Sequence, residues 1–294
     1  MRWARLYFAA QAIAGAAWWI AVFTSDFVRE TTLGSLHPFA VAAFDVPLFV
    51  VASAIAALGV KPAAIVATGW TTLVAVALAV YATVTTEAGW GVLLMAAAVG
   101  GSLLALSLML IGRVPTEWII AGPFAFKPAQ VGSPHVADTL AQVVVFWGLF
   151  LGVGPLIISL VEQRWALSVD FPAFAEPVGI VVLVLASALG IWSAITMSTL
   201  GDGTPLPSAM ATKLVIAGPY RFVRNPMAVA GIVQGAAVGL IVGSWLVLVY
   251  AVLGSLLWNY AVRPLEEADL EARFPDDYGR YRDDVRCWIP RRLW

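Results

Sequence analysis

The sequence predicts an all-α protein that crosses a lipid bilayer about eight times. Hydrophobic residues make up 61% of the 294 residues and charged residues only 12%, a balance typical of membrane proteins and not of soluble domains. The apolar residues gather in runs of about 17 to 23, the length that a helix needs to cross about 30 Å of hydrocarbon. These runs do not alternate with polar residues, which argues against the strands of a membrane barrel.

The apolar runs place the membrane spans along the chain. We expect spans at residues 6–24, 39–59, 63–84, 90–111, 139–161 and 176–198. The apolar block 227–262 is too long for one crossing, and Gly243-Ser244 at its middle predicts a tight turn between two short helices. The first run continues to Phe23 without a small-residue cleavage site, so we interpret it as a span and not as a signal peptide.

Positive charge is distributed unequally between the two faces of this bundle. With both termini on one side, that face collects fifteen Lys and Arg residues, and the opposite face keeps only Arg29 and Arg164. By the positive-inside rule, both termini should be cytoplasmic. Fourteen Arg against three Lys, with much Ala and Val, favour a bacterial source and therefore the bacterial inner membrane. The net charge of −1 gives no indication of a nucleic-acid partner.

We divide the chain into three regions. Residues 1–111 form four spans with short loops and have no predicted role, and residues 112–138 are a linker rich in Pro, Gly and aromatic residues. Residues 139–294 contain the remaining spans, a cytoplasmic loop at 199–225 and an Arg-rich tail that we expect to form a short cytosolic helical cap. Because charge returns next to the membrane in this third region, we expect the chemistry there.

Two polar segments flank the last helical hairpin. The first is Gly218-Pro219-Tyr220-Arg221-Phe222-Val223-Arg224-Asn225-Pro226, and the second, Arg263-Pro264-Leu265-Glu266-Glu267, follows the last span directly. The first could clamp a polar ligand, or it could be a basic loop that contacts lipid headgroups. The second could carry catalytic carboxylates, or it could be a helix that starts at Pro264 with Glu in its first turn.

These segments, together with Phe274-Pro275, Tyr278, Tyr281, Val285 and Ile289-Pro290, resemble the isoprenylcysteine carboxyl methyltransferase and phospholipid methyltransferase family in order and spacing. The resemblance covers about 200–290 firmly and 139–198 loosely, and residues 1–135 show none. It implies a cytosolic S-adenosylmethionine site lined by Leu214, Val215, Gly218, Tyr220, Asn225 and Pro226 and completed by Glu266 and Glu267. It also implies that Arg263 and Glu266 face the methyl acceptor. Asn225 stands where the family often has His, and Ala228 where it often has Tyr.

The resemblance implies a membrane methyltransferase that acts on a lipophilic carboxylate or amine. One alternative is a nicotinamide-dependent membrane reductase of the steroid-reductase type, against which the acidic pair without a basic cluster argues. Another is a transporter or a non-enzymatic scaffold, but the two halves show no repeat of the kind that transporters have. Nothing in the sequence names the acceptor or the oligomeric state.

Several other residues give weaker signals. His37 and His135 have no carboxylate cluster at ligand spacing, so we expect no metal site. Asp45 lies inside the second span, where it is either functional or paired with Gln11 or nearby backbone. We interpret the tryptophans near span ends as interfacial anchors: Trp18, Trp19, Trp70, Trp90, Trp165 and Trp245. Four glycines at every fourth position from Gly231 to Gly243 predict close packing of the seventh helix.

Overall fold

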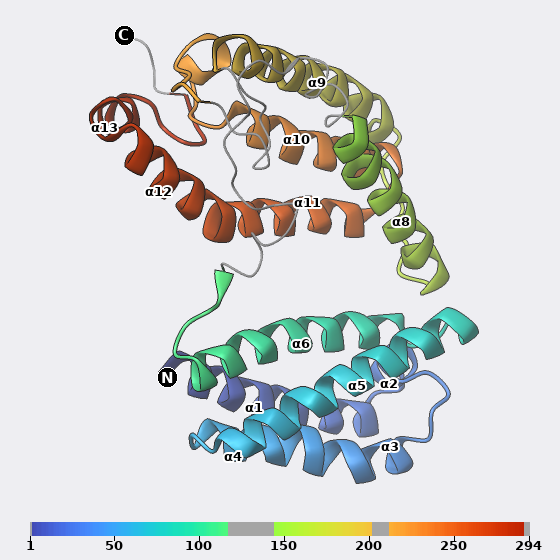
Figure 1. Ribbon diagram of the computed structural model, residues 1–294. Coiled ribbons are helices and arrows are strands. Elements are labelled where there is room, and N and C mark those ends of the chain that lie inside the picture. The colour runs from blue at the N-terminus through green and yellow to red at the C-terminus, as the bar shows by residue number, and fades with distance from the viewer. Residues whose placement is uncertain (1, 117–143, 202–211, 291–294) are drawn as a thin grey trace. The chain divides into compact units, whose positions relative to one another are not determined.

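The computed structural model describes residues 2–116, 144–201 and 212–290 (Figure 1). All regular elements within these ranges are helices, which confirms the all-α prediction. Within these described ranges, seven helices are long and apolar enough to cross a membrane. They are α1 (Arg2–Thr24); α3 (Pro38–Asp45) continued by η1 (Val46–Val51) and α4 (Ala52–Ala57); α5 (Lys61–Thr85); α6 (Gly89–Leu110); the helix Val144–Arg164, which contains η4 (Gly148–Val153) and α8 (Gly154–Arg164); α9 (Ala175–Leu200); and α11 (Trp245–Leu257) continued by η7 (Trp258–Val262) and α12 (Arg263–Arg273).

The predicted hairpin at 227–262 is present, but its two helices differ in length. The first is α10 (Pro226–Ile241), and its 16 residues rise by only about 24 Å, which is less than the hydrocarbon thickness. The second does not end at residue 262, because it continues as α12 to Arg273. Among the described helices, seven and not eight are therefore long enough to cross. Residues 139–143 of the fifth predicted span lie outside the described residues, as does most of the linker 112–138.

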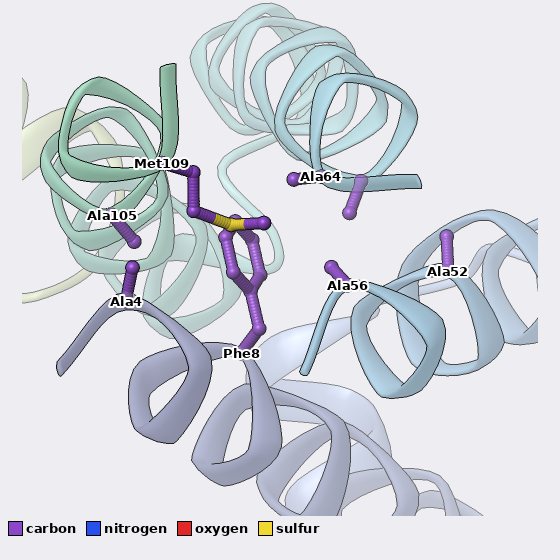
Figure 2. Close-up of a cluster of buried hydrophobic side chains, with 8 residues drawn as sticks. Ala4, Phe8, Ala52, Ala56, Ala64, Ala105 and Met109 are labelled. Atoms are coloured by element: carbon purple, nitrogen blue, oxygen red, sulfur yellow. The ribbon is translucent and has the colours of Figure 1, made fainter. Parts of the chain in front are cut away.

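The chain forms two compact units, which we describe separately. The first comprises Met1–Pro115 with Val161–Leu167, and the second comprises Thr116–Leu160 with Ser168–Trp294. The first unit packs around small residues of α1, α4, α5 and α6, with Phe8 and Met109 as the large side chains among them. Figure 2 shows the Met109 thioether lying against the Phe8 ring. Alanines at the surrounding positions let the helix backbones approach closely.

Polar side chains of the first unit bond across its helices. Both carboxylate oxygens of Asp45 accept hydrogen bonds at 2.8 Å from indole N–H groups, one from Trp19 and one from Trp70. Of the alternatives for Asp45, the pairing with Gln11 is not observed, because Gln11 instead bonds to Tyr7, Ser53 and Ser102. Trp19 and Trp70 donate their indole N–H groups to Asp45 within the unit, so these two N–H groups are not available to lipid headgroups.

In the second unit, α9, α10 and α11 lie side by side in that order (Figure 1). The four glycines of the predicted stripe lie in three different environments. Gly235 and Gly239 face α11, where added Cβ atoms would lie 3.2 Å from Ala251 and 2.7 Å from Leu248. Gly243 has a φ of +61° and forms the turn before α11, whereas Gly231 borders open space. Close packing is thus confined to the middle of the predicted stripe.

Among the residues that the structure describes, each of the three π-helical turns contains a proline or comes just before one. Pro47 lies within η1, Pro155 comes two residues after η4, and Pro264 comes two residues after η7. Proline has no N–H and clashes with the carbonyl four residues earlier. Backbone hydrogen bonds near it therefore span five residues in place of the usual four. At the end of η7, the Arg263 N–H bonds to the Trp258 carbonyl, five residues back. Helix α11 therefore continues through η7 into α12, and the helix start at Pro264, one of the two alternatives for this segment, is a junction within a longer helix.

Candidate functional site

A cavity of about 120 Å³ lies in the second unit, where the segment 212–225, the start of α10, α12 and α13 (Pro275–Asp284) meet. Seven of the nine residues that the sequence predicts for the site line it. They are Leu214, Val215, Tyr220, Asn225, Arg263, Glu266 and Glu267. The first four come from the segment before α10, and the last three come from the first turn and a half of α12. The hairpin of α10 and α11 brings these two segments together.

The other two predicted residues, Gly218 and Pro226, do not line the cavity and act on the local backbone. Gly218 has a φ of +55° at the start of the short helix η6 (Gly218–Arg221), and an added Cβ would lie 2.8 Å from Thr196 Oγ1 on α9. Pro226 is buried at the first position of α10, where the missing N–H costs no helical hydrogen bond. Both residues fix the path of the segment that carries Tyr220 and Asn225.

Asn225 joins the start of α10 to the acidic pair. It is the N-cap of α10, and its Oδ1 accepts a hydrogen bond of 3.0 Å from the Ala228 N–H. Its Nδ2 donates to Glu266 Oε2 at 3.3 Å. Asn is among the best N-cap residues, so this replacement for the family's frequent His has a structural reason. Ala228 contributes its backbone N–H to the same cap.

Arg224 holds three segments of the site together. Its Nη2 forms a salt bridge of 2.9 Å with Glu267 Oε1, and the two side chains are 13% and 26% exposed. Its Nη1 donates to the carbonyl oxygens of Arg282 at 3.0 Å and Val285 at 3.3 Å. A guanidinium has donors enough for such a fork, so Arg224 connects α12 with the end of α13.

Helix α13 covers the segment before α10 with two buried tyrosines. The Tyr281 hydroxyl donates to the Tyr220 carbonyl oxygen at 2.7 Å, and Tyr278 is among the most fully buried side chains. Burial raises the pKa of Tyr278 to about 12, with a further contribution from the negative charge of Glu267. Burial and, second, the charge of Glu266 raise the pKa of Tyr220 far above its usual value. These phenols are therefore neutral hydrogen-bonding groups at physiological pH.

Two charged groups of the cavity lack a partner of opposite charge among the described residues. Glu266 has the Asn225 amide as its hydrogen-bond donor and forms no salt bridge there. The Nε of Arg263 is buried without a hydrogen-bond partner. Neighbouring carboxylates are otherwise neutralised, since Asp269 pairs with Arg273 at 2.7 Å and Glu267 pairs with Arg224. Buried polar atoms without partners are uncommon, so the Nε of Arg263 is available to a ligand, as are the lone pairs of Glu266 that Asn225 leaves unused.

Several residues that line the cavity were not assigned to the site from the sequence, although three of them stand in the segments that carry the resemblance. They are Met197, Lys213, Arg224, Met227, Trp258, Asp269, Leu270, Arg273, Tyr278, Tyr281 and Cys287. A local signal existed for Arg224, which stands two residues before Pro226 in the segment already singled out. Burial raises the pKa of the Cys287 thiol, and a hydrogen bond from Arg263 opposes that rise.

The arrangement of acidic pair, arginines and N-capped hairpin can be compared with known families. Residues 175–277 match the phospholipid methyltransferase family. This match confirms the resemblance, and it extends from α9 to the start of α13, a stretch that we call the methyltransferase region. No curated protein and no solved structure gives a match. Together with the apolar helices, this match supports an integral membrane protein that is similar to phospholipid methyltransferases over residues 175–277.

Proposed function

We propose that the protein transfers a methyl group from S-adenosylmethionine to a lipophilic carboxylate or amine. The observation that carries this proposal is the convergence of both ends of the methyltransferase region's hairpin on one cavity. There, Glu266 and the Nε of Arg263 have no partner of opposite charge among the described residues. We further propose that this cavity faces the cytoplasm of a bacterial inner membrane and that both termini lie on that side, as the distribution of Arg and Lys predicts.

The side chains around the cavity fit the chemistry of the cofactor. S-adenosylmethionine has a sulfonium and an ammonium cation, a carboxylate and an adenosine. Glu266 offers a carboxylate to a cation, Arg263 offers an N–H donor to a carboxylate, and Tyr220 and Trp258 offer aromatic surface. The volume of about 120 Å³ is below the roughly 300 Å³ at which sites for drug-sized ligands begin. We therefore expect α13 and the segment 212–225 to separate when the cofactor binds.

When bound, S-adenosylmethionine supplies an activated methyl group: a lone pair of the acceptor forms the new bond to carbon, and the sulfur–carbon bonding pair returns to sulfur. The protein contributes mainly by aligning the acceptor and excluding water. Arg263 would hold an acceptor carboxylate, which needs no base. An amine acceptor must lose a proton, and Glu266 is the carboxylate placed to accept it. Both roles lie at the polar end of the long helix formed by α11 and α12.

The test is calorimetric titration of S-adenosylhomocysteine into the detergent-purified full chain. Wild-type protein should bind one equivalent, and Glu266→Gln should weaken binding about tenfold or more, because a charge-assisted contact is lost. Glu271→Gln is the matched control: Glu271 lies on the same helix, pairs with exposed Arg282 at 3.2 Å and does not line the cavity. This control should bind like the wild type.

A parallel titration with NADPH separates the methyltransferase from the reductase alternative. Binding of S-adenosylhomocysteine without competition by NADPH supports the proposal. Binding of NADPH alone would refute the proposed cofactor. Equal loss of affinity in the Glu266 and Glu271 variants would refute the proposed site.

A further inference from the structure

The first unit contains a second cavity, of about 870 Å³. This volume lies within the roughly 300 to 1,000 Å³ of sites for small organic ligands. The cavity is lined by α1, the end of α2 (Asp26–Thr32), α3, η1, α5 and α6. Along α1 the lining extends from Tyr7 to Trp18, a rise of about 16 Å. The space is therefore long enough to hold an extended alkyl chain beside the helices.

The walls of this cavity are almost entirely hydrocarbon. Aliphatic and aromatic side chains from the segment after α2 and from α3, η1, α5 and α6 line it: Leu33, Leu36, Val41, Phe44, Phe49, Val74, Leu78, Leu94 and Met95. The uncharged polar side chains in its wall are already bonded, since Gln11 contacts Ser53 and Tyr7, and Thr32 contacts Trp18 and the Val28 carbonyl. A ligand that fills this space must therefore be largely apolar.

Asp45 is the carboxylate that lines this apolar space. It is 5% exposed and lies seven residues after Pro38, about 10 Å along the helix. The indole N–H groups of Trp19 and Trp70 each donate to one of its oxygens. Two donors leave about two lone-pair positions of a carboxylate unused. Aromatic rings line the same cavity, among them Trp18, Phe44 and Trp70.

No salt bridge to Asp45 forms within the part of the chain that the structure describes. Three arginines of the unit are bound elsewhere. Arg5 donates to the Ala57 carbonyl, Arg29 pairs with Asp26, and Arg164 donates to the Thr83 and Val84 carbonyls. A carboxylate buried without a cation is costly, and ionisable residues within membrane helices commonly mark functional sites.

The geometry points to a binding site for a lipophilic cation in the first unit. The hydrocarbon part of the ligand, an alkylamine or alkylammonium, fills the apolar space. Its cationic end pairs with Asp45 beside the aromatic rings, which attract cations through their faces. This inference does not depend on the proposed methyl transfer, since none of its residues belongs to the methyltransferase region.

The test uses decyltrimethylammonium, whose charge does not change with pH. Binding of the radiolabelled compound to the full chain in lipid nanodiscs is measured by scintillation proximity, and binding to empty nanodiscs is subtracted. We expect saturable binding of one equivalent, which uncharged decanol of the same chain length does not displace. Asp45→Asn should weaken binding about tenfold or more, whereas the matched control Asp26→Asn, at an exposed carboxylate of the same unit, should not.

A second variant guards against a folding defect in Asp45→Asn. Ala77 lines the cavity on α5, and Ala77→Phe reduces its volume while leaving Asp45 and both indole bonds in place. This variant should also lose binding and keep the wild-type circular dichroism spectrum. Equal competition by decanol, wild-type affinity in Asp45→Asn, or the absence of saturable binding to the wild type would each overturn the inference.

Discussion

Replacing Asn225 separates the two contacts of its side chain. Asn225→Ser keeps an oxygen that can cap α10, but the shorter side chain cannot reach Glu266. Asn225→Ala removes both contacts. The distance of 3.3 Å from Asn225 Nδ2 to Glu266 Oε2 is long for a hydrogen bond, so we take its contribution as about 1 kcal/mol, below the usual range for a charged acceptor. That value corresponds to about fivefold in affinity.

The two variants should therefore differ in stability and agree in ligand binding. Loss of an N-cap costs about 1 kcal/mol, so Asn225→Ala should unfold about 2 to 4 °C lower than the wild type, whereas Asn225→Ser should unfold near the wild-type temperature. Both should bind S-adenosylhomocysteine about fivefold more weakly, because Glu266 loses its positioning donor. Thermal unfolding in detergent and calorimetric titration measure the two quantities. Wild-type affinity in Asn225→Ser would refute the positioning role of Asn225.

Three further predictions follow from the packing of the second unit. Gly239→Ala should lower the free energy of unfolding by about 1 to 3 kcal/mol, because the new Cβ would lie 2.7 Å from Leu248. The control Gly231→Ala, whose Cβ meets open space, should leave it unchanged. Equal effects of the two variants on thermal unfolding would contradict the packing assigned to Gly239. Arg224→Met should destabilise the protein by about 2 kcal/mol in denaturant titration, since Glu267 loses its partner in a partly exposed pair, and adding Glu267→Gln should recover part of that loss. Cys287 is the single cysteine, and burial raises the pKa of its thiol. The rate of maleimide labelling should therefore increase at a higher pH in the folded chain than in the unfolded chain, and S-adenosylhomocysteine should slow labelling further. Identical pH profiles would show that the thiol is not buried.

The fold was accessible from the sequence because membrane helices depend on local composition. The ends of most predicted spans lie within a few residues of the observed helix ends, since apolar length alone decides them. The extent of α12 was not accessible, because Arg263 and Pro264 look like a helix start when read locally. The π-helical turn before them keeps the helix continuous, and its bonding between Arg263 and Trp258 leaves no compositional signal.

The site was accessible only in part, because its contacts join distant segments. The Tyr281 hydroxyl bonds to a carbonyl 61 residues earlier, and Arg224 pairs with a carboxylate 43 residues later. Such pairs follow from the way α13 folds back on the segment before α10, which local patterns do not encode. The resemblance found Asn225 and Glu266 separately, whereas the contact between them comes from the structure.

The turn Trp258–Val262 sets the angular phase between an apolar helix and a charged one. An α-helix advances by about 100° per residue. The extra residue of the π turn therefore rotates the side chains of α12 by about that angle about the helix axis, relative to those of α11. Deleting one residue there, such as Ala261, would leave the mean hydropathy of the span nearly unchanged. It would nevertheless carry Arg263, Glu266 and Glu267 to another face of the helix. In this protein the orientation of the charged groups therefore depends on the length of one helical turn, and two chains with indistinguishable hydropathy could differ in whether these groups reach the cavity.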